Sequence, residues 1–167
     1  MNDAFNIPFV GLKLGQHQFE FNVDSSFFET LSYSLIEKGA LKVWLTIEKK
    51  ETMLLASFQV DGTVEMVCSR CNDPMEAEVE GELDLIYKFG FESIDDENLI
   101  VISPDSFEID VKQPIYELIT VSLPSRPIHE EGKCDEDMVK LIEKFQVKEK
   151  KDNDNIDPRW SALKNLN

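Results

Sequence analysis

The sequence has few basic residues and no long hydrophobic run, and each shortage excludes a class of protein. Its 167 residues include 17 Lys and Arg against 33 Asp and Glu, which gives a formal net charge of −16. Because binding to nucleic acid without sequence preference needs surplus positive charge, this balance disfavours such binding and favours basic partners. No stretch approaches the roughly 20 apolar residues of a membrane helix, so we predict no membrane contact.

Cysteine, glycine and proline are also scarce. Three cysteines cannot all pair with one another, which disfavours a disulfide scaffold and suits a reducing compartment. Seven glycines and seven prolines exclude collagen-like and low-complexity chains. The first residues lack the basic and apolar stretches of a secretory signal. The sequence therefore predicts a cytoplasmic protein, and its 42% of apolar residues are enough for a core.

The first part of the chain predicts a hairpin and a helix. Phe19, Phe21 and Val23 alternate with polar residues after a turn centred near Gly15, so we interpret residues 6–23 as a hairpin. A helix is expected next, because Ser26 and Glu29 have the spacing of a capping box and apolar residues then share one face. Gly39 is a suitable end for this helix.

Longer stretches of alternation follow. Strands are predicted over residues 41–47 and over residues 54–66. Asp61 and Gly62 mark either a hairpin turn or a bend within one long strand, and the pattern does not decide between them. The clearest alternation covers residues 75–89 and predicts a strand with one buried and one solvated face.

The solvated face of that strand is acidic. It carries Glu76, Glu78, Glu80, Glu82 and Asp84. One interpretation is an ordinary solvated sheet face, as half-exposed antiparallel strands often have. The other is a docking face for a basic protein, since neighbouring like charges are otherwise mildly destabilising.

The second half predicts two short strands and then helices. The strands cover residues 99–102 and 107–109. One helix is expected to start at Pro114 and to end before Pro124. Asp135 can cap another helix, whose apolar residues recur with helical spacing. Its apolar stripe consists of Met138, Leu141, Ile142 and Phe145.

The end of the chain predicts a linker and a last short helix. Residues 148–157 are charged and show no apolar period. The predicted amphipathic helix over residues 158–167 carries Trp160, Leu163 and Leu166 on one side. This side could pack on the protein's own core or dock a partner. Residues 1–147 then form a single α+β domain with an antiparallel sheet, open or barrel-like, and with packed helices.

Cys68 and Cys71 are the strongest chemical signal. They lie two residues apart between two predicted strands, at the tip of a hairpin, where a tight turn can direct both thiols at one ion. A redox pair would normally open a helix, and none is predicted here. Two unrelated core cysteines are the other alternative. The spacing favours a zinc knuckle.

A structural zinc site needs two further ligands. His129 and Cys134 lie in a loop with four residues between them, which is within the usual range for a second pair. Alone, His129 would be an ordinary exposed histidine, and His17 is expected to be solvated. Three thiolates and one imidazole would leave no open position for a reacting water, and no phosphate loop, nucleophile elbow or metalloprotease motif is present. We therefore predict no enzyme.

Together, these motifs resemble the YceD family, the large ribosomal RNA subunit accumulation proteins. The resemblance rests on an ordered set of motifs: Cys68-Ser-Arg-Cys71 followed by Pro74, Leu123-Pro124-x-x-Pro127-x-His129-Glu130 with Cys134, and Asp157-Pro158-Arg159-Trp160-x-Ala162-Leu163. It implies a role in the synthesis or stability of large-subunit ribosomal RNA, with no enzymatic activity. Suspected metal and nucleic-acid binding also belong to this resemblance.

The charge and the resemblance point to different partners. A net charge of −16 favours contact with a basic ribosomal or rRNA-processing protein over direct contact with RNA. The alternative is a direct RNA-binding zinc-knuckle module. Candidate nucleic-acid residues are Arg70 and Lys88 beside the sheet, and Lys148, Lys150 and Lys151 in the linker. The sequence thus predicts a non-catalytic ribosome-biogenesis factor.

Overall fold

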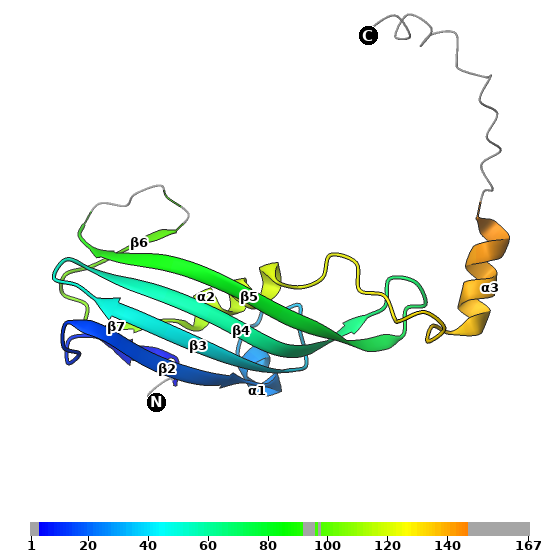
Figure 1. The fold of residues 1–167 in the computed structure, drawn as a ribbon, viewed down its shortest axis with the longest axis horizontal. Helices are drawn as coiled ribbons and strands as arrows, with labels where there is room; N and C mark the ends of the chain where they lie inside the picture. Colours follow the sequence, from blue (N-terminus) through cyan, green and yellow to red (C-terminus); the bar gives the residue numbers. More distant parts are fainter. Residues whose placement is uncertain (1–3, 92–95, 97, 147–167) are drawn as a thin grey trace, which may run out of the picture.

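The computed structural model describes residues 4–91, 96 and 98–146. Its elements are β1 Asn6–Pro8, β2 Gly15–Val23, α1 Ser25–Glu29, β3 Gly39–Lys49, β4 Met53–Val67, β5 Pro74–Phe89, β6 Leu99–Ile102, β7 Glu108–Asp110, α2 Lys112–Val121 and α3 Glu136–Phe145. Five strands form one sheet in the order β2–β3–β4–β5–β6, and β1 pairs with β7 in a second, two-stranded sheet (Figure 1). In this part of the chain, no helix combines the length and apolar character needed to cross a membrane.

The large sheet buries one face only. Along β3, β4 and β5, every second side chain is buried, and the residues between them are mostly exposed or half-buried. Helix α2 packs against β5 and β4 through a face that includes Ile115, Leu118 and Ile119, each at most 1% exposed. The core therefore lies between the sheet and α2, and the α+β class predicted from the sequence is confirmed.

The sheet is open and mixed, so the barrel-like alternative is wrong. Its outer strands, β2 and β6, are not paired with each other. Strand β6 runs parallel to β5, whereas all other pairings in this sheet are antiparallel. The prediction of a purely antiparallel sheet is wrong at this one edge, because alternation along a strand carries no information about the direction of its neighbour.

The predicted hairpin over residues 6–23 is also wrong. Strand β1 pairs with β7, where Ile7 faces Ile109, and both side chains are buried. Strand β2 instead pairs with β3, where Phe19 faces Leu45. The alternation of Phe19, Phe21 and Val23 lies in β2, but Gly15 is the first residue of that strand and not a turn. The partners of β1 and β2 are set by apolar contacts between distant parts of the chain.

The predicted helix from Ser26 to Gly39 is much shorter in the structure. Helix α1 ends at Glu29, and its N-cap is Asp24, whose side chain accepts a hydrogen bond from the Ser26 backbone N–H at 2.9 Å. Beyond it, the Leu35 backbone N–H donates to the Tyr116 hydroxyl of α2 at 3.1 Å. The segment between α1 and β3 is formed by turns, in which the Ser34 backbone N–H donates to the Leu31 carbonyl at 3.0 Å, and the Leu35 side chain is 86% exposed.

Strand β4 is one continuous strand through Asp61 and Gly62, which settles the question that the sequence left open. Both residues pair with β3, and Gly62 has a φ of +150°. A Cβ atom at Gly62 would lie 2.3 Å from the Ala40 carbonyl oxygen. Glycine at this position therefore permits close approach of two paired strands rather than a turn.

The second half of the chain agrees with the sequence in its elements but not in all of their packing. Strands β6 and β7 and helix α2 lie where they were predicted, and Asp135 caps α3 by accepting from the Met138 backbone N–H at 2.8 Å. However, α3 has no buried residue and lies beyond the end of the sheet (Figure 1), so it is not one of the packed helices. The predicted linker 148–157 and helix 158–167 fall outside the described residues.

Replacing Gly62 with alanine should destabilise the domain. The added Cβ would collide with the β3 backbone and the positive φ would be strained, so we expect Gly62→Ala to lower the free energy of unfolding by about 2 kcal/mol. Gly11→Ala is the matched control, because nothing lies within 4 Å of its Cβ position. Urea unfolding followed by circular dichroism measures both, and equal stability of the two variants would contradict the assignment.

Candidate metal centre

The end of the β4–β5 hairpin brings two thiols together. Cys68 and Cys71 lie in the loop that joins the strands, directly after Val67 has paired with Pro74. The turn is closed by the Asn72 backbone N–H, which donates to the Cys68 carbonyl at 2.9 Å, and Asn72 has a φ of +65°. Both cysteines are buried, at 1% and 3% exposure.

The loop before α3 brings an imidazole and the third thiol to this turn. The Ser69 backbone N–H donates to the Pro127 carbonyl at 2.8 Å, which holds the loop beside the hairpin. The Nε2 atom of His129 lies 3.3 Å from the Pro74 carbonyl oxygen. If Nε2 carries the proton and donates it there, the Nδ1 lone pair faces the cysteines and is available to a metal. Cys134 follows five residues later, and both His129 and Cys134 are half-buried.

The four donor atoms have the spacing of tetrahedral ligands. All of them lie within 4.8 Å of one another. The Sγ atoms of Cys68 and Cys134 are 3.9 Å apart, and His129 Nδ1 is 3.3 Å from Cys71 Sγ and 3.9 Å from Cys134 Sγ. A zinc ion with four such ligands would separate two sulfurs by about 3.8 Å and a sulfur from a nitrogen by about 3.5 Å. These four residues could therefore hold a metal ion.

The electrostatics of the cluster favour a bound cation. Burial raises the pKa of the Cys68 thiol, but backbone N–H groups of Cys71, His129 and Arg70 outweigh it and lower this pKa to about 5. Cys68 is then a thiolate at neutral pH, which is the form that binds metals. Burial and the neighbouring sulfurs of Cys68 and Cys71 raise the pKa of Cys134. A cation would relieve this crowding of negative charge.

The surroundings of the cysteines do not fit the other two interpretations. No helix begins at Cys68 or Cys71, because β5 starts at Pro74, and the redox interpretation needs a helix N-terminus to activate a thiol. The two thiols also lie beside His129 and Cys134 rather than among the side chains of the apolar core. His17 is not part of the cluster; its Nε2 lies 2.8 Å from the Lys13 carbonyl oxygen.

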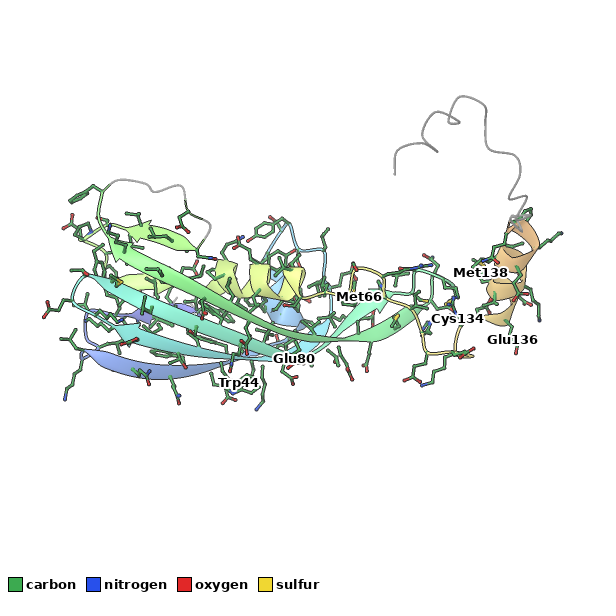
Figure 2. All side chains as sticks on the ribbon, turned by 45° about the horizontal axis from the view of Figure 1, so that its top comes forward. Trp44, Met66, Glu80, Cys134, Glu136 and Met138 are labelled. Atoms are coloured by element: carbon green, nitrogen blue, oxygen red, sulfur yellow. The ribbon has the colours of Figure 1, made fainter. Side chains whose placement is uncertain are left out.

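The acidic residues of β5 form a surface of their own. All five are exposed and lie on the outer face of the sheet, and none is in an ion pair with another described residue. Asp61 on β4 lies directly opposite Glu80. Trp44 on β3 projects from the same face and is 39% exposed (Figure 2). The sequence interpretation missed Trp44, although its even position among buried odd residues of β3 was the available signal.

The two nucleic-acid candidates of the sheet do not form a patch. Arg70 is exposed in the loop before β5, and Lys88 is exposed near the other end of the same strand. At about 3.3 Å per residue, a strand of 16 residues is about 50 Å long. The linker lysines and the residues Trp160, Leu163 and Leu166 lie outside the described residues.

These features define a mixed α+β domain with a one-sided sheet and a cluster of three thiols and one imidazole. The chain belongs to the YceD family, described as large ribosomal RNA subunit accumulation protein YceD, whose family model matches residues 56–167. The match includes all four residues of the candidate metal site and the acidic strand β5. The family description connects the chain with the accumulation of large-subunit ribosomal RNA. No curated protein and no solved structure matches the chain.

Cobalt(II) provides a direct test of the cluster. We expect one Co²⁺ per chain with the intense ligand-to-metal absorption of cobalt–thiolate bonds, because the donors are nitrogen and sulfur at tetrahedral spacing. Cys71→Ser should weaken this absorption by about a third and lower the melting temperature of the loaded protein, since binding energy at such a site is also folding energy. Ser69→Ala, between the two cysteines, is the control. No thiolate absorption in the wild type would rule out the site.

Proposed function

We propose that the protein is a non-catalytic ribosome-biogenesis factor that supports the accumulation of large-subunit ribosomal RNA by contacting a basic ribosomal or rRNA-processing protein. Membership of the YceD family supports a role in the accumulation of large-subunit ribosomal RNA. The observation that carries the mode of action is the acidic outer face of β5, where none of the five carboxylates is in an ion pair with another described residue. We also propose a cytoplasmic location, in line with the unpaired thiols.

We propose zinc as the metal, bound by Cys68, Cys71, His129 and Cys134. Three thiolates and an imidazole suit zinc and disfavour calcium and magnesium, which prefer oxygen ligands. Four protein ligands would complete a tetrahedral shell and leave no position for a water or substrate. The zinc would then be structural, and it gives no support to a catalytic role.

The acidic face supports a basic partner because it carries a stability cost. Asp61 faces Glu80 across the β4–β5 ladder, and like charges at such positions are mildly destabilising. Glu65, which lies opposite Glu76, pairs with Lys38 at 3.1 Å. On the other side of Asp61 lies Lys42, which pairs with Glu20 at 3.2 Å. Trp44 is flanked on the neighbouring strands by Glu20 and Gln59. An exposed tryptophan among carboxylates is suited to stacking against arginine side chains of a partner.

Direct RNA binding is the competing function, and salt dependence separates the two. Phosphate binding releases counterions and weakens steeply with added salt. Around the four ligands, the described structure offers the exposed Arg70 and Arg126, whereas Lys133 is paired with Glu130 at 2.7 Å. Affinity capture from a lysate, with and without ribonuclease, tests the proposal. Capture of a basic large-subunit or processing protein that survives ribonuclease supports it, and recovery of RNA alone contradicts it.

Reversing charges on the acidic face should slow association with the partner. The side chains of Glu76, Glu78 and Glu80 are exposed and make no hydrogen bond or ion pair with other described residues, so changing all three to lysine should leave the fold intact. We expect the association rate with purified basic large-subunit proteins to fall several-fold at low salt and to converge with the wild-type rate at high salt. Surface plasmon resonance across an ionic-strength series measures this.

The control for that experiment carries the same change of net charge elsewhere. Glu29, Glu51 and Asp105 are exposed and lie off the outer face of β5. Replacing these three with lysine should alter the association rate much less. Equal slowing by both triple variants would show that only net charge matters and would contradict the docking face. Tight binding of the wild type to protein-free ribosomal RNA, unaffected by the reversal, would favour direct RNA recognition.

Deleting residues 156–167 should weaken partner capture without unfolding the domain. The core of the described chain lies entirely before residue 124, so the deletion removes none of it. We expect the melting temperature to change by no more than about 2 °C and the captured partner to fall several-fold. Trp160→Ala in the full chain isolates the aromatic contribution. Loss of the folded state on deletion would place this segment in the core and contradict a docking role.

A further inference from the structure

Helix α3 is almost unsupported by packing. None of its ten residues is buried, and Phe145 at the end of its apolar stripe is 71% exposed. Within the helix, Asp135 is the N-cap and Lys140 pairs with Glu136 at 3.4 Å and with Asp137 at 3.8 Å. The Lys144 ammonium also lies 5.7 Å from the centre of the Phe145 ring. Such contacts contribute a few tenths to about 1 kcal/mol each, and isolated helices of this length are marginal in water.

The hairpin tip is the part of the domain closest to α3. Arg70 from the tip and Val139, Ile142, Glu143 and Gln146 line a small hollow of about 220 Å³. Within the described residues, no hydrogen bond or ion pair joins residues 135–146 to any strand. The position of α3 beside the tip therefore needs another cause.

The four residues of the candidate metal site lie between the hairpin tip and α3. Cys134 immediately precedes Asp135, the N-cap of α3, so the fourth ligand and the start of the helix are adjacent residues. Figure 2 shows Cys134 between the end of the sheet and α3, with Glu136 and Met138 on the helix itself. The last hydrogen bond that ties the preceding loop to the hairpin is that of His129 with Pro74. Beyond it, the sulfur of Cys134 is the remaining link.

We propose that the metal ion holds α3 on the hairpin tip, so that an occupied site fixes the helix beside Arg70 and an empty site releases it while the sheet stays folded. This inference rests on the zinc site proposed above. Metal occupancy would then decide whether the Met138, Leu141, Ile142 and Phe145 stripe is presented in a fixed direction. The sheet does not depend on the cluster in the same way, because its core is complete without the four ligands.

Backbone ¹⁵N relaxation of the full-length protein tests this. In the zinc-loaded protein we expect order parameters of about 0.85 along both α3 and β4. After chelation, those of α3 should fall below about 0.6 while those of β4 stay unchanged, and added zinc should restore them. Elemental analysis of the same samples reports the zinc content.

Four variants separate the metal link from other causes. Cys134→Ser should loosen α3 even with zinc present, because it removes the ligand next to the helix. Cys134→His should keep α3 rigid, since imidazole also binds zinc, and Lys133→Ser controls for changes beside the ligand. Arg70→Ala tests the only side chain of the tip that lines the hollow, and we expect it to leave α3 rigid in the zinc-loaded protein.

Each other outcome overturns the inference. If α3 is equally rigid with and without zinc, or loose in both states, the metal does not hold it. If β4 loses order together with α3, the metal supports the whole fold and not only the attachment of α3 to the hairpin tip. Stoichiometric zinc with unchanged α3 dynamics overturns this inference alone, whereas absence of zinc binding overturns the proposed zinc site as well.

Discussion

The antiparallel pairing of β4 with β5 continues in register from Met53 and Lys88 to Val67 and Pro74. The core, the acidic surface and the candidate metal site all depend on this ladder. Its inner side supplies the centre of the core, and its outer side carries the acidic row of β5. Its closed end places Cys68 and Cys71 in one tight turn. Because side chains alternate along a strand, a single ladder can supply a dry face and a charged face together.

The candidate metal site lies at the end of the β4–β5 hairpin, beyond the apolar core, which contains none of its four residues. Beside the hairpin tip, the chain segment from Pro127 to Cys134 has Pro127 as its one buried residue and few backbone hydrogen bonds to the sheet. Four ligands from two distant segments would connect this region through metal–ligand bonds, which need little buried area. The lowered pKa of Cys68 and the hydrogen bond from His129 to Pro74 prepare two of these ligands before any ion arrives.

Charge and metal serve different parts of the proposed function. The acidic row and Trp44 form a rigid surface, since they project from central strands of the sheet and their positions do not depend on the cluster. Such a surface gains mainly in association rate when it meets a basic protein. The proposed link through Cys134 concerns α3, an exposed helix that has no buried residue.

Local patterns in the sequence were enough to locate those elements that depend on residues close to one another along the chain. The alternation of residues 75–89 fixed both faces of β5, Asp135 and the apolar spacing after it fixed α3, and the spacing of Cys68 and Cys71 indicated the metal site. Only the tertiary structure decided which strands pair, since β1 with β7 and β5 with β6 depend on contacts between distant residues. It also decided that α1 stops at Glu29, and that the Leu35 backbone N–H further along donates to the Tyr116 hydroxyl of α2 rather than within a helix. The same holds for Gly62, whose role depends on the Ala40 carbonyl of a neighbouring strand, which no pattern along β4 reveals.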